Sequence, residues 1–241
     1  MIITRGLTRR FDNLVAVDNL DVEIPAGRIV ALLGANGAGK TTTLNMLTTL
    51  MPPSSGTAEV GGFDIQEQGG DVRRILGYVP EHGALYEGLT ANEYLELSGR
   101  IRGLSASEVE ARATHWLEFF ELTEFRDQRL ASFSKGMRRK VLVTSALLHE
   151  PRILFLDEPM DGLDVRSQKK LGELLQEQAA AGCTVVYSSH ILQQVEELCE
   201  HVVLIHQGTL RWQGDLDDLK AGHAGAGLRD IFLELTEEGP A

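Results

Sequence analysis

The stretch IVALLGANGAGKTTTLNML, residues 29–47, combines three patterns that decide the fold. Its first five residues are all apolar, which predicts a β-strand buried on both faces, as in a parallel sheet. The glycine-rich segment GANGAGKT at residues 34–41 follows directly, and the residues after it predict a helix that ends before Pro52. A strand, a glycine-rich loop and a helix in this order predict a phosphate-binding site within an α/β fold.

The loop matches the pattern G-x-x-x-x-G-K-[ST]. Its glycines let the backbone turn tightly, so that successive N–H groups point at phosphate oxygens beside a helix N-terminus. We expect Lys40 to reach the β- and γ-phosphates of a nucleotide and the Thr41 hydroxyl to bind Mg²⁺. A glycine-rich turn with no ligand is the alternative, and the flanking strand and helix disfavour it. The residues expected to bind the nucleotide here are Gly34, Ala35, Asn36, Gly37, Ala38, Gly39, Lys40, Thr41 and Thr42.

A second apolar segment ends in two carboxylates. ILFLDEP, residues 153–159, predicts a buried strand that ends at Asp157 and Glu158. We expect Asp157 to face the Mg²⁺ shell, through a water molecule, and Glu158 to orient or deprotonate the attacking water as a catalytic residue. The alternative is that both carboxylates only end the strand. Because adjacent carboxylates repel a polyphosphate, we expect Mg²⁺ to be required.

A third predicted strand leads to a histidine. His190 closes the segment TVVYSSH, residues 184–190. In a parallel sheet the carboxyl ends of the strands meet at one edge, where ligands bind. An imidazole there is within reach of a γ-phosphate or the attacking water, so Lys40, Glu158 and His190 are the expected catalytic residues. A surface or core histidine without a function is the alternative for His190.

The composition sets the class of protein. Hydrophobic residues make up 43% and charged residues 24% of the 241 residues, which fits one large α/β domain, or a core with a smaller inserted lobe. The net charge of −12 argues against a surface that follows a nucleic-acid backbone. Cys183 and Cys199 lack metal-type spacing, which favours a reducing compartment. We find no signal-peptide pattern at the N-terminus and no apolar stretch long enough to span a bilayer.

The order of the predicted elements divides the chain. The N-terminal segment reads as β-strands, and residues 90–122 read as helical, with capping-box spacing at Thr90 and again at Ser105. From Ser134 onward, helices and apolar strands alternate, which predicts a largely parallel sheet. Residues 221–227, AGHAGAG, predict a flexible joint before a short amphipathic helix.

Taken together with four further motifs, these segments resemble the nucleotide-binding subunit of ATP-binding-cassette (ABC) transporters over essentially the whole chain. Phe11 stands where that family has an aromatic residue that stacks on adenine. GYVPEH at residues 77–82 is similar to the loop that senses the membrane partner, and FSKGM at residues 133–137 to the signature loop. MDGLD at residues 160–164 is similar to the loop after the carboxylate-bearing strand, and His190 to the switch histidine.

The resemblance implies a fold and its boundaries. The fold is a P-loop NTPase core with a mostly parallel sheet, an N-terminal antiparallel β portion and an inserted all-helical lobe. The core is expected at about residues 1–82 and 150–222, and the helical lobe at about 83–149. Residues 223–241 are expected to form a short linker and the C-terminal amphipathic helix, so that the whole chain is a single ABC ATPase domain.

The resemblance also implies that two subunits pair head to tail when they bind ATP, as a homodimer or with a paired ABC ATPase subunit. Ser134, Gly136 and Asp164 would then act in trans on the ATP held by the partner subunit. A simple helix cap at Ser134 is compatible with this role. The cations from Lys135 to Lys140 form either a solvated face or a source of positive potential. An integral membrane permease is the implied further partner, with the chain cytoplasmic and peripheral on the cytoplasmic face of the cell membrane, and nucleic acid is not expected.

Four residues depart from the family pattern. Glu81 stands where the family usually has Gln, and since a carboxylate only accepts hydrogen bonds, we expect this coupling-loop residue to act through Mg²⁺ or water. Lys135 and Met137 replace the usual Gly and Gln, and Asp161 the usual Ser. The Ser-Lys-Gly-Met form most resembles ABC-2 type exporters. A soluble ABC ATPase that acts on ribosomes or DNA is the alternative, whereas a P-loop kinase would leave FSKGM and His190 unexplained.

Overall fold

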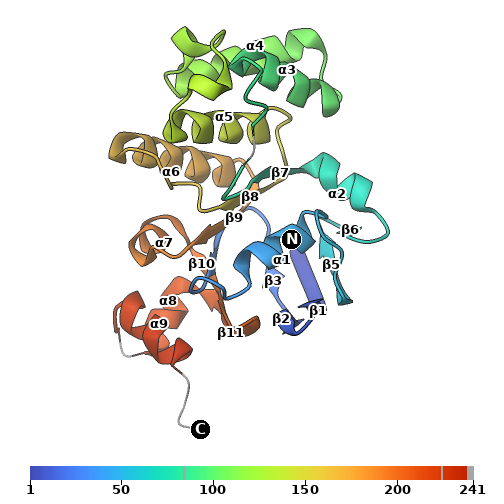
Figure 1. The fold of residues 1–241 in the computed structure, drawn as a ribbon. Coiled ribbons are helices and arrows are strands. Elements are labelled where there is room, and N and C mark those ends of the chain that lie inside the picture. Colours follow the sequence, from blue (N-terminus) through green and yellow to red (C-terminus); the bar gives the residue numbers. More distant parts are fainter. Residues whose placement is uncertain (84, 224, 238–241) are drawn as a thin grey trace.

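The computed structural model describes residues 1–83, 85–223 and 225–237. Strands and helices alternate along much of the chain (Figure 1). The strands are β1 (Ile2–Phe11), β2 (Leu14–Leu20), β3 (Glu23–Ile24), β4 (Ile29–Leu33), β5 (Ser55–Val60), β6 (Phe63–Asp64), β7 (Leu76–Val79), β8 (Ile153–Asp157), β9 (Thr184–Ser189), β10 (His201–His206) and β11 (Thr209–Asp215). The helices are α1 (Lys40–Leu47), α2 (Gly69–Ile75), α3 (Ala91–Ile101), α4 (Ala106–Phe119), α5 (Lys135–Leu147), α6 (Val165–Ala180), α7 (Leu192–Leu198), α8 (Leu216–Gly222) and α9 (Leu228–Thr236), with 3₁₀ turns at Thr123–Phe125 and Leu130–Ser132.

The central sheet has six strands in the order β11-β10-β4-β9-β8-β7. All its neighbouring strands run parallel except β11, which is antiparallel to β10. Every residue of β4, β8 and β9 is buried. This burial on both faces explains the unbroken apolar runs in these strands, which cover all of β4, residues 153–156 of β8 and residues 185–187 of β9.

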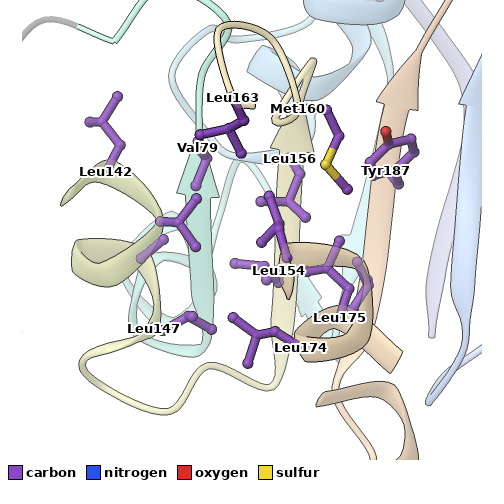
Figure 2. Close-up of a cluster of buried hydrophobic side chains, with 14 of the residues drawn as sticks. Val79, Leu142, Leu147, Leu154, Leu156, Met160, Leu163, Leu174, Leu175 and Tyr187 are labelled. Carbon is purple, nitrogen blue, oxygen red and sulfur yellow. The ribbon is translucent and has the colours of Figure 1, made fainter. Parts of the chain in front are cut away.

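The apolar side chains of β8 alternate between two hydrophobic cores. Leu154 and Leu156 belong to one core, which lies between the sheet, α5 and α6 and extends into the neighbouring helices (Figure 2). Ile153 and Phe155 belong to the other, which the sheet shares with α1 and the N-terminal strands. Full burial of each such side chain contributes about 1.5–3 kcal/mol. The strand is therefore fixed in register from both sides.

The second sheet is antiparallel, in the order β2-β1-β5-β6 with β3 also paired to β1. The sequence indicated only part of it. Strand β1 extends to Phe11, well beyond the apolar start of the chain, and the expected strand at residues 15–24 is divided into β2 and β3. Asn19 adopts a left-handed φ of 46° just before this division. Strands β5 and β6 carry few consecutive apolar residues, so periodicity did not reveal them.

Helices α3, α4 and α5 stack together at one end of the molecule (Figure 1). Both expected capping boxes are present, with Thr90 capping α3 and Ser105 capping α4. The segment expected to be helical throughout residues 90–122 is broken between these helices, where Gly103 has a φ of +86°. These helices form the inserted lobe, so the predicted combination of parallel core, antiparallel portion and helical lobe is confirmed.

The C-terminal segment also follows the predicted pattern in part. Helix α9 is amphipathic, with Leu228 and Ile231 buried, as expected. The expected joint at residues 221–227 overlaps the end of α8, and Ala224 within it lies outside the described residues. The last four residues of the expected C-terminal segment, 238–241, lie outside them as well. Among the residues that are described, no helix has both the length and the apolarity needed to cross a bilayer.

The close approach of β7 to α5 provides a test of the packing. A Cβ atom added at Gly77 would lie 2.3 Å from the Ala146 carbonyl oxygen, whereas one at Gly70 in α2 would meet nothing within 4 Å. We expect Gly77→Ala to lower the free energy of unfolding by about 1–3 kcal/mol because backbone atoms must shift. Gly70→Ala should leave it unchanged or raise it by up to about 1 kcal/mol, since alanine favours a helix. Urea denaturation of both variants measures the difference, and equal midpoints would contradict this close approach.

Candidate functional site

Many of the predicted site residues meet at the carboxyl-terminal edge of the central sheet. Leu33 at the end of β4 pairs with Ser189 of β9, and Asp157 at the end of β8 pairs with Ser188. The three segments that follow these strands therefore begin side by side. They surround a cavity of about 580 Å³. Of the predicted residues, those that line this cavity are Phe11, Asn36, Gly37, Gly39, Lys40, Thr41, Thr42, Glu81, Asp157, Glu158 and His190.

The glycine-rich loop forms one wall of the cavity and leads into α1. Gly39 caps this helix in a left-handed conformation with a φ of 103°, which glycine adopts without a steric penalty. A side chain there would also collide with the Ala16 carbonyl oxygen, 2.5 Å from the Cβ position. Gly34 is equally confined, because its Cβ position lies 2.4 Å from the Ile205 carbonyl oxygen. The loop is thus packed closely against neighbouring backbone.

Lys40 is buried beside the loop that contains it. Its ammonium donates to the carbonyl oxygens of Gly34 at 2.7 Å and Ala35 at 3.2 Å. Burial lowers the pKa of Lys40 from its usual value, while the carboxylates of Glu158 and Asp157 act in the opposite direction. An ammonium group has three donors, and only two are directed at these carbonyls. The remaining capacity and the helix N-terminus suit a phosphate group.

Thr41 and Asp157 form a polar pair at the base of the cavity. The Thr41 hydroxyl donates to Asp157 Oδ2 at 2.7 Å, and only 1% of the Asp157 surface is exposed. Asp157 Oδ1 is buried without a hydrogen-bond partner among the described residues. Because an unpaired buried carboxylate oxygen is costly, this donor set fits a hydrated cation. No three His, Cys, Asp or Glu side chains within the described ranges cluster as metal ligands, so phosphate oxygens and water would complete the shell.

Glu158 and His190 are in direct contact. Glu158 Oε1 lies 2.7 Å from His190 Nδ1, and the Ser189 hydroxyl donates to Glu158 Oε2 at 3.5 Å. Glu158 also has a left-handed φ of 48°, a conformation that is strained for a residue with a side chain. Strain of this kind persists where the surrounding structure holds it, and it is frequent at functional sites. The arrangement places a carboxylate, oriented by an imidazole, in the wall of the cavity.

Phe11 comes to the cavity from the antiparallel sheet. Its ring lies 4.7 Å from the Arg9 guanidinium carbon, and Arg9 is held by a 2.8 Å hydrogen bond to the Pro52 carbonyl. Leu14, Val15 and Ala16 of β2 continue this apolar wall. Sequence reasoning missed these three residues and Ser189. Ser189 precedes His190 in a motif that was recognised, whereas nothing local distinguishes the β2 residues.

Ser134, Gly136 and Asp164 do not line the cavity. Ser134 caps α5 by accepting from the Met137 N–H at 3.2 Å, and Asp164 caps α6 by accepting from the Ser167 N–H at 2.9 Å. A Cβ at Gly136 would lie 2.7 Å from the Gly162 carbonyl oxygen, so the FSKGM and MDGLD loops touch. A single chain therefore does not bring these residues to Lys40.

An ion pair joins the same two loops. Lys135 Nζ lies 2.6 Å from Asp161 Oδ2, and both residues depart from the usual family pattern. This hydrogen bond lowers the pKa of Asp161 from its usual value. Because both side chains are largely exposed, the pair contributes little to stability on its own. The pair does hold the FSKGM and MDGLD loops in contact at these two side chains.

Comparison with known proteins gives a consistent result. Residues 17–161, more than half of the chain, match the family described as ABC transporter. The chain is 37% identical to the ABC transporter ATP-binding protein NatA of Bacillus subtilis (strain 168), with 99% of each chain covered. It is 36% identical to the daunorubicin/doxorubicin resistance ATP-binding protein DrrA of Streptomyces peucetius, covering 91% of this chain and 67% of that protein.

Solved structures agree with these matches. An ATP-binding subunit of an ABC transporter superposes with a TM-score of 0.92 at 35% identity, covering 98% of this chain and 100% of that one. A dimeric ATP-binding cassette in a post-hydrolysis state, bound to ADP and Pi, gives a TM-score of 0.83 at 25% identity over 90% of this chain and 99% of that one. Sequence and fold thus agree, and the chain belongs to the ABC transporter family.

Proposed function

We propose that this chain is an ATPase subunit that works as a dimer and powers solute export through a separate membrane permease. The observation that carries the proposal is the division of the site. Lys40 and Glu158 line the cavity, whereas Ser134 lies at the start of α5, outside it. A second copy, or a paired ABC ATPase subunit, supplies the missing wall. The solved cassette of similar fold that is dimeric with ADP and Pi supports this arrangement.

The nucleotide binds across both sheets. The adenine stacks on Phe11, and the triphosphate follows residues 34–42 to Lys40, which contacts the β- and γ-phosphates. Thr41 and Asp157 would hold Mg²⁺, Asp157 through water, and Glu81 is a further candidate ligand. Bound there, Mg²⁺ would neutralise phosphate charge that these carboxylates otherwise repel.

The chemical step is general-base hydrolysis. Glu158 orients a water molecule and accepts its proton, and the water oxygen attacks the γ-phosphorus in line with the β–γ bridging oxygen. The bond to the bridging oxygen breaks, and ADP and phosphate result. His190 holds the Glu158 carboxylate through Nδ1 and faces the γ-phosphate. From the partner subunit, the residues equivalent to Ser134, Gly136 and Asp164 bind the outer side of that phosphate.

ATP closes the dimer and hydrolysis reopens it. We assign residues 1–82 and 150–222 to the core and residues 83–149 to the helical lobe, and α3, α4 and α5 support this division. The Glu81 loop joins the two parts and passes the motion to the permease on the cytoplasmic face of the cell membrane. The relative named for daunorubicin/doxorubicin resistance, and the ABC-2 type motif around Lys135, support export as the direction.

Glu158→Gln tests the catalytic base. The amide cannot accept the proton, so we expect kcat to fall by about 10²–10⁴-fold while ATP still binds and the dimer accumulates in its ATP-bound form. The rate of phosphate release measures kcat, and light scattering measures the amount of dimer. Glu118→Gln, an exposed change on α4, is the control that should retain activity. Sustained turnover in Glu158→Gln would reject the assignment.

Lys40→Ala tests the phosphate loop. Removal of a buried cation that contacts phosphate should weaken ATP binding about tenfold or more. Lys169→Ala, at an exposed position of α6, should bind ATP as the unmodified chain does. Calorimetric titration with Mg·ATP measures both affinities. Unchanged binding in Lys40→Ala would count against this loop as the nucleotide site.

Dilution tests whether the site is shared. If each active site needs two copies, turnover per subunit must fall as the protein is diluted through the dimer dissociation constant. Ser134→Ala should lower turnover at every concentration because the partner's ATP loses a donor. The test measures ATP hydrolysis over a wide range of protein concentrations. A rate per subunit that stays constant down to the monomer would exclude shared sites.

A further inference from the structure

Arg139 is a buried cation in the second turn of α5, with only 4% of its surface exposed. Its guanidinium donates from Nη1 to the Pro80 carbonyl at 2.7 Å and from Nη2 to the Glu81 carbonyl at 2.8 Å. A buried charge is costly unless its donors are satisfied, and here two backbone oxygens of one loop satisfy them. The fork therefore fixes the position of that loop against α5.

The charge of Arg139 is balanced by the acidic side of the nucleotide site. Burial lowers the pKa of the Arg139 guanidinium from its usual value, and the carboxylates of Asp161, Asp157, Glu81 and Glu158 act against that effect. Among the described residues, none of these carboxylates forms an ion pair with Arg139 within 4.0 Å. The cation is thus placed by carbonyl contacts and stabilised by the field of the site as a whole.

The two ends of this connection belong to different active sites. Glu81 lines the cavity that contains Lys40, and its carbonyl oxygen accepts a hydrogen bond from Arg139. Ser134, five residues before Arg139, caps the same helix. In the proposed dimer Ser134 acts on the nucleotide of the partner subunit. Helix α5 thus connects the Glu81 loop of one site to a residue proposed to act in the other.

We propose that Arg139 is a positioning residue that couples the two shared active sites, carrying the state of the Glu81 loop to Ser134. This inference rests on the proposed dimer. Nucleotide in one cavity sets the Glu81 loop, the guanidinium fork moves with it, and the start of α5 takes the position that closes on the partner's nucleotide. The Lys135–Asp161 pair also joins α5 to the core, but it is exposed and weaker.

Arg138 provides a matched control on the same helix. It also donates to two backbone carbonyls, those of Phe133 and Ala131, and it pairs with Glu87 at 2.8 Å. All three contacts lie within the segment assigned to the helical lobe. Replacement by lysine keeps the charge at either position but removes the planar fork that reaches two carbonyls at once. Only the change at Arg139 interrupts the path to the Glu81 loop.

The experiment compares Arg139→Lys and Arg138→Lys in the Glu158→Gln chain, where ATP-bound dimers accumulate. We expect Arg139→Lys to raise the ATP concentration for half-maximal dimer formation by at least about fivefold, the lower range of allosteric coupling factors. The ATP affinity of the diluted, unpaired chain should change less than twofold. Arg138→Lys should change neither quantity by more than twofold. Size-exclusion chromatography with light scattering measures dimer formation, and fluorescence titration measures the ATP affinity of the unpaired chain.

If Arg139 had only a structural role, Arg139→Lys would change the ATP affinity of the unpaired chain and dimer formation together. That result would overturn the coupling, and so would an unchanged ATP concentration for half-maximal dimer formation. If Arg139→Lys does not fold, hydrogen exchange of the wild-type chain, kept too dilute to pair, decides instead. ATP should change the exchange of the amides of residues 135–140, and no change would reject the proposal. If Glu158→Gln forms no dimer with Arg139 intact, the shared-site function fails, which is a distinct outcome.

Discussion

The parallel pairing of β4, β8 and β9 is the constraint on which the rest of the structure depends. Because these strands run in the same direction and in register, the phosphate loop, the carboxylate pair and His190 all begin at one edge of the sheet. Hydrophobic cores on both faces hold that register. A shift of one residue in β8 would turn Phe155 and Leu156 each to the face opposite its present core, and it would displace Asp157 from Thr41.

This rigid sheet sustains a site whose parts are individually unfavourable. Glu158 has a strained backbone, Asp157 keeps a buried oxygen with no hydrogen-bond partner in the described part of the chain, and Lys40 is buried against its own loop. Each feature costs free energy in the isolated chain. The buried groups of Asp157 and Lys40 are also suited to a triphosphate with its cation, because the cation would balance the charge of Asp157 and the phosphates that of Lys40. Binding energy can then be directed at closing the site.

The inserted lobe connects two distant positions of the chain through helix α5. Helix α5 carries Ser134 away from the cavity of its own chain, yet Arg139 ties the same helix to the Glu81 loop of that cavity. In the proposed dimer, one helix thus contacts the loop beside one nucleotide and acts on the other nucleotide. Such coupling requires a stiff element that is fixed at two points. Helix α5, with thirteen residues and a capped N-terminus, is such an element.

The sequence by itself determined the local motifs: the phosphate loop, the carboxylates at the end of β8, His190, and the capped helices of the lobe. Each depends on neighbouring residues, so a pattern is enough to reveal it. The site assignments for Ser134 and Asp164 came from the family resemblance. Only the tertiary structure revealed β5 and β6, the apolar wall beside Phe11, the Ser189 contact to Glu158 and the Arg139 fork. These join residues far apart in the chain, and such contacts follow from strand register and helix packing, which local sequence does not encode.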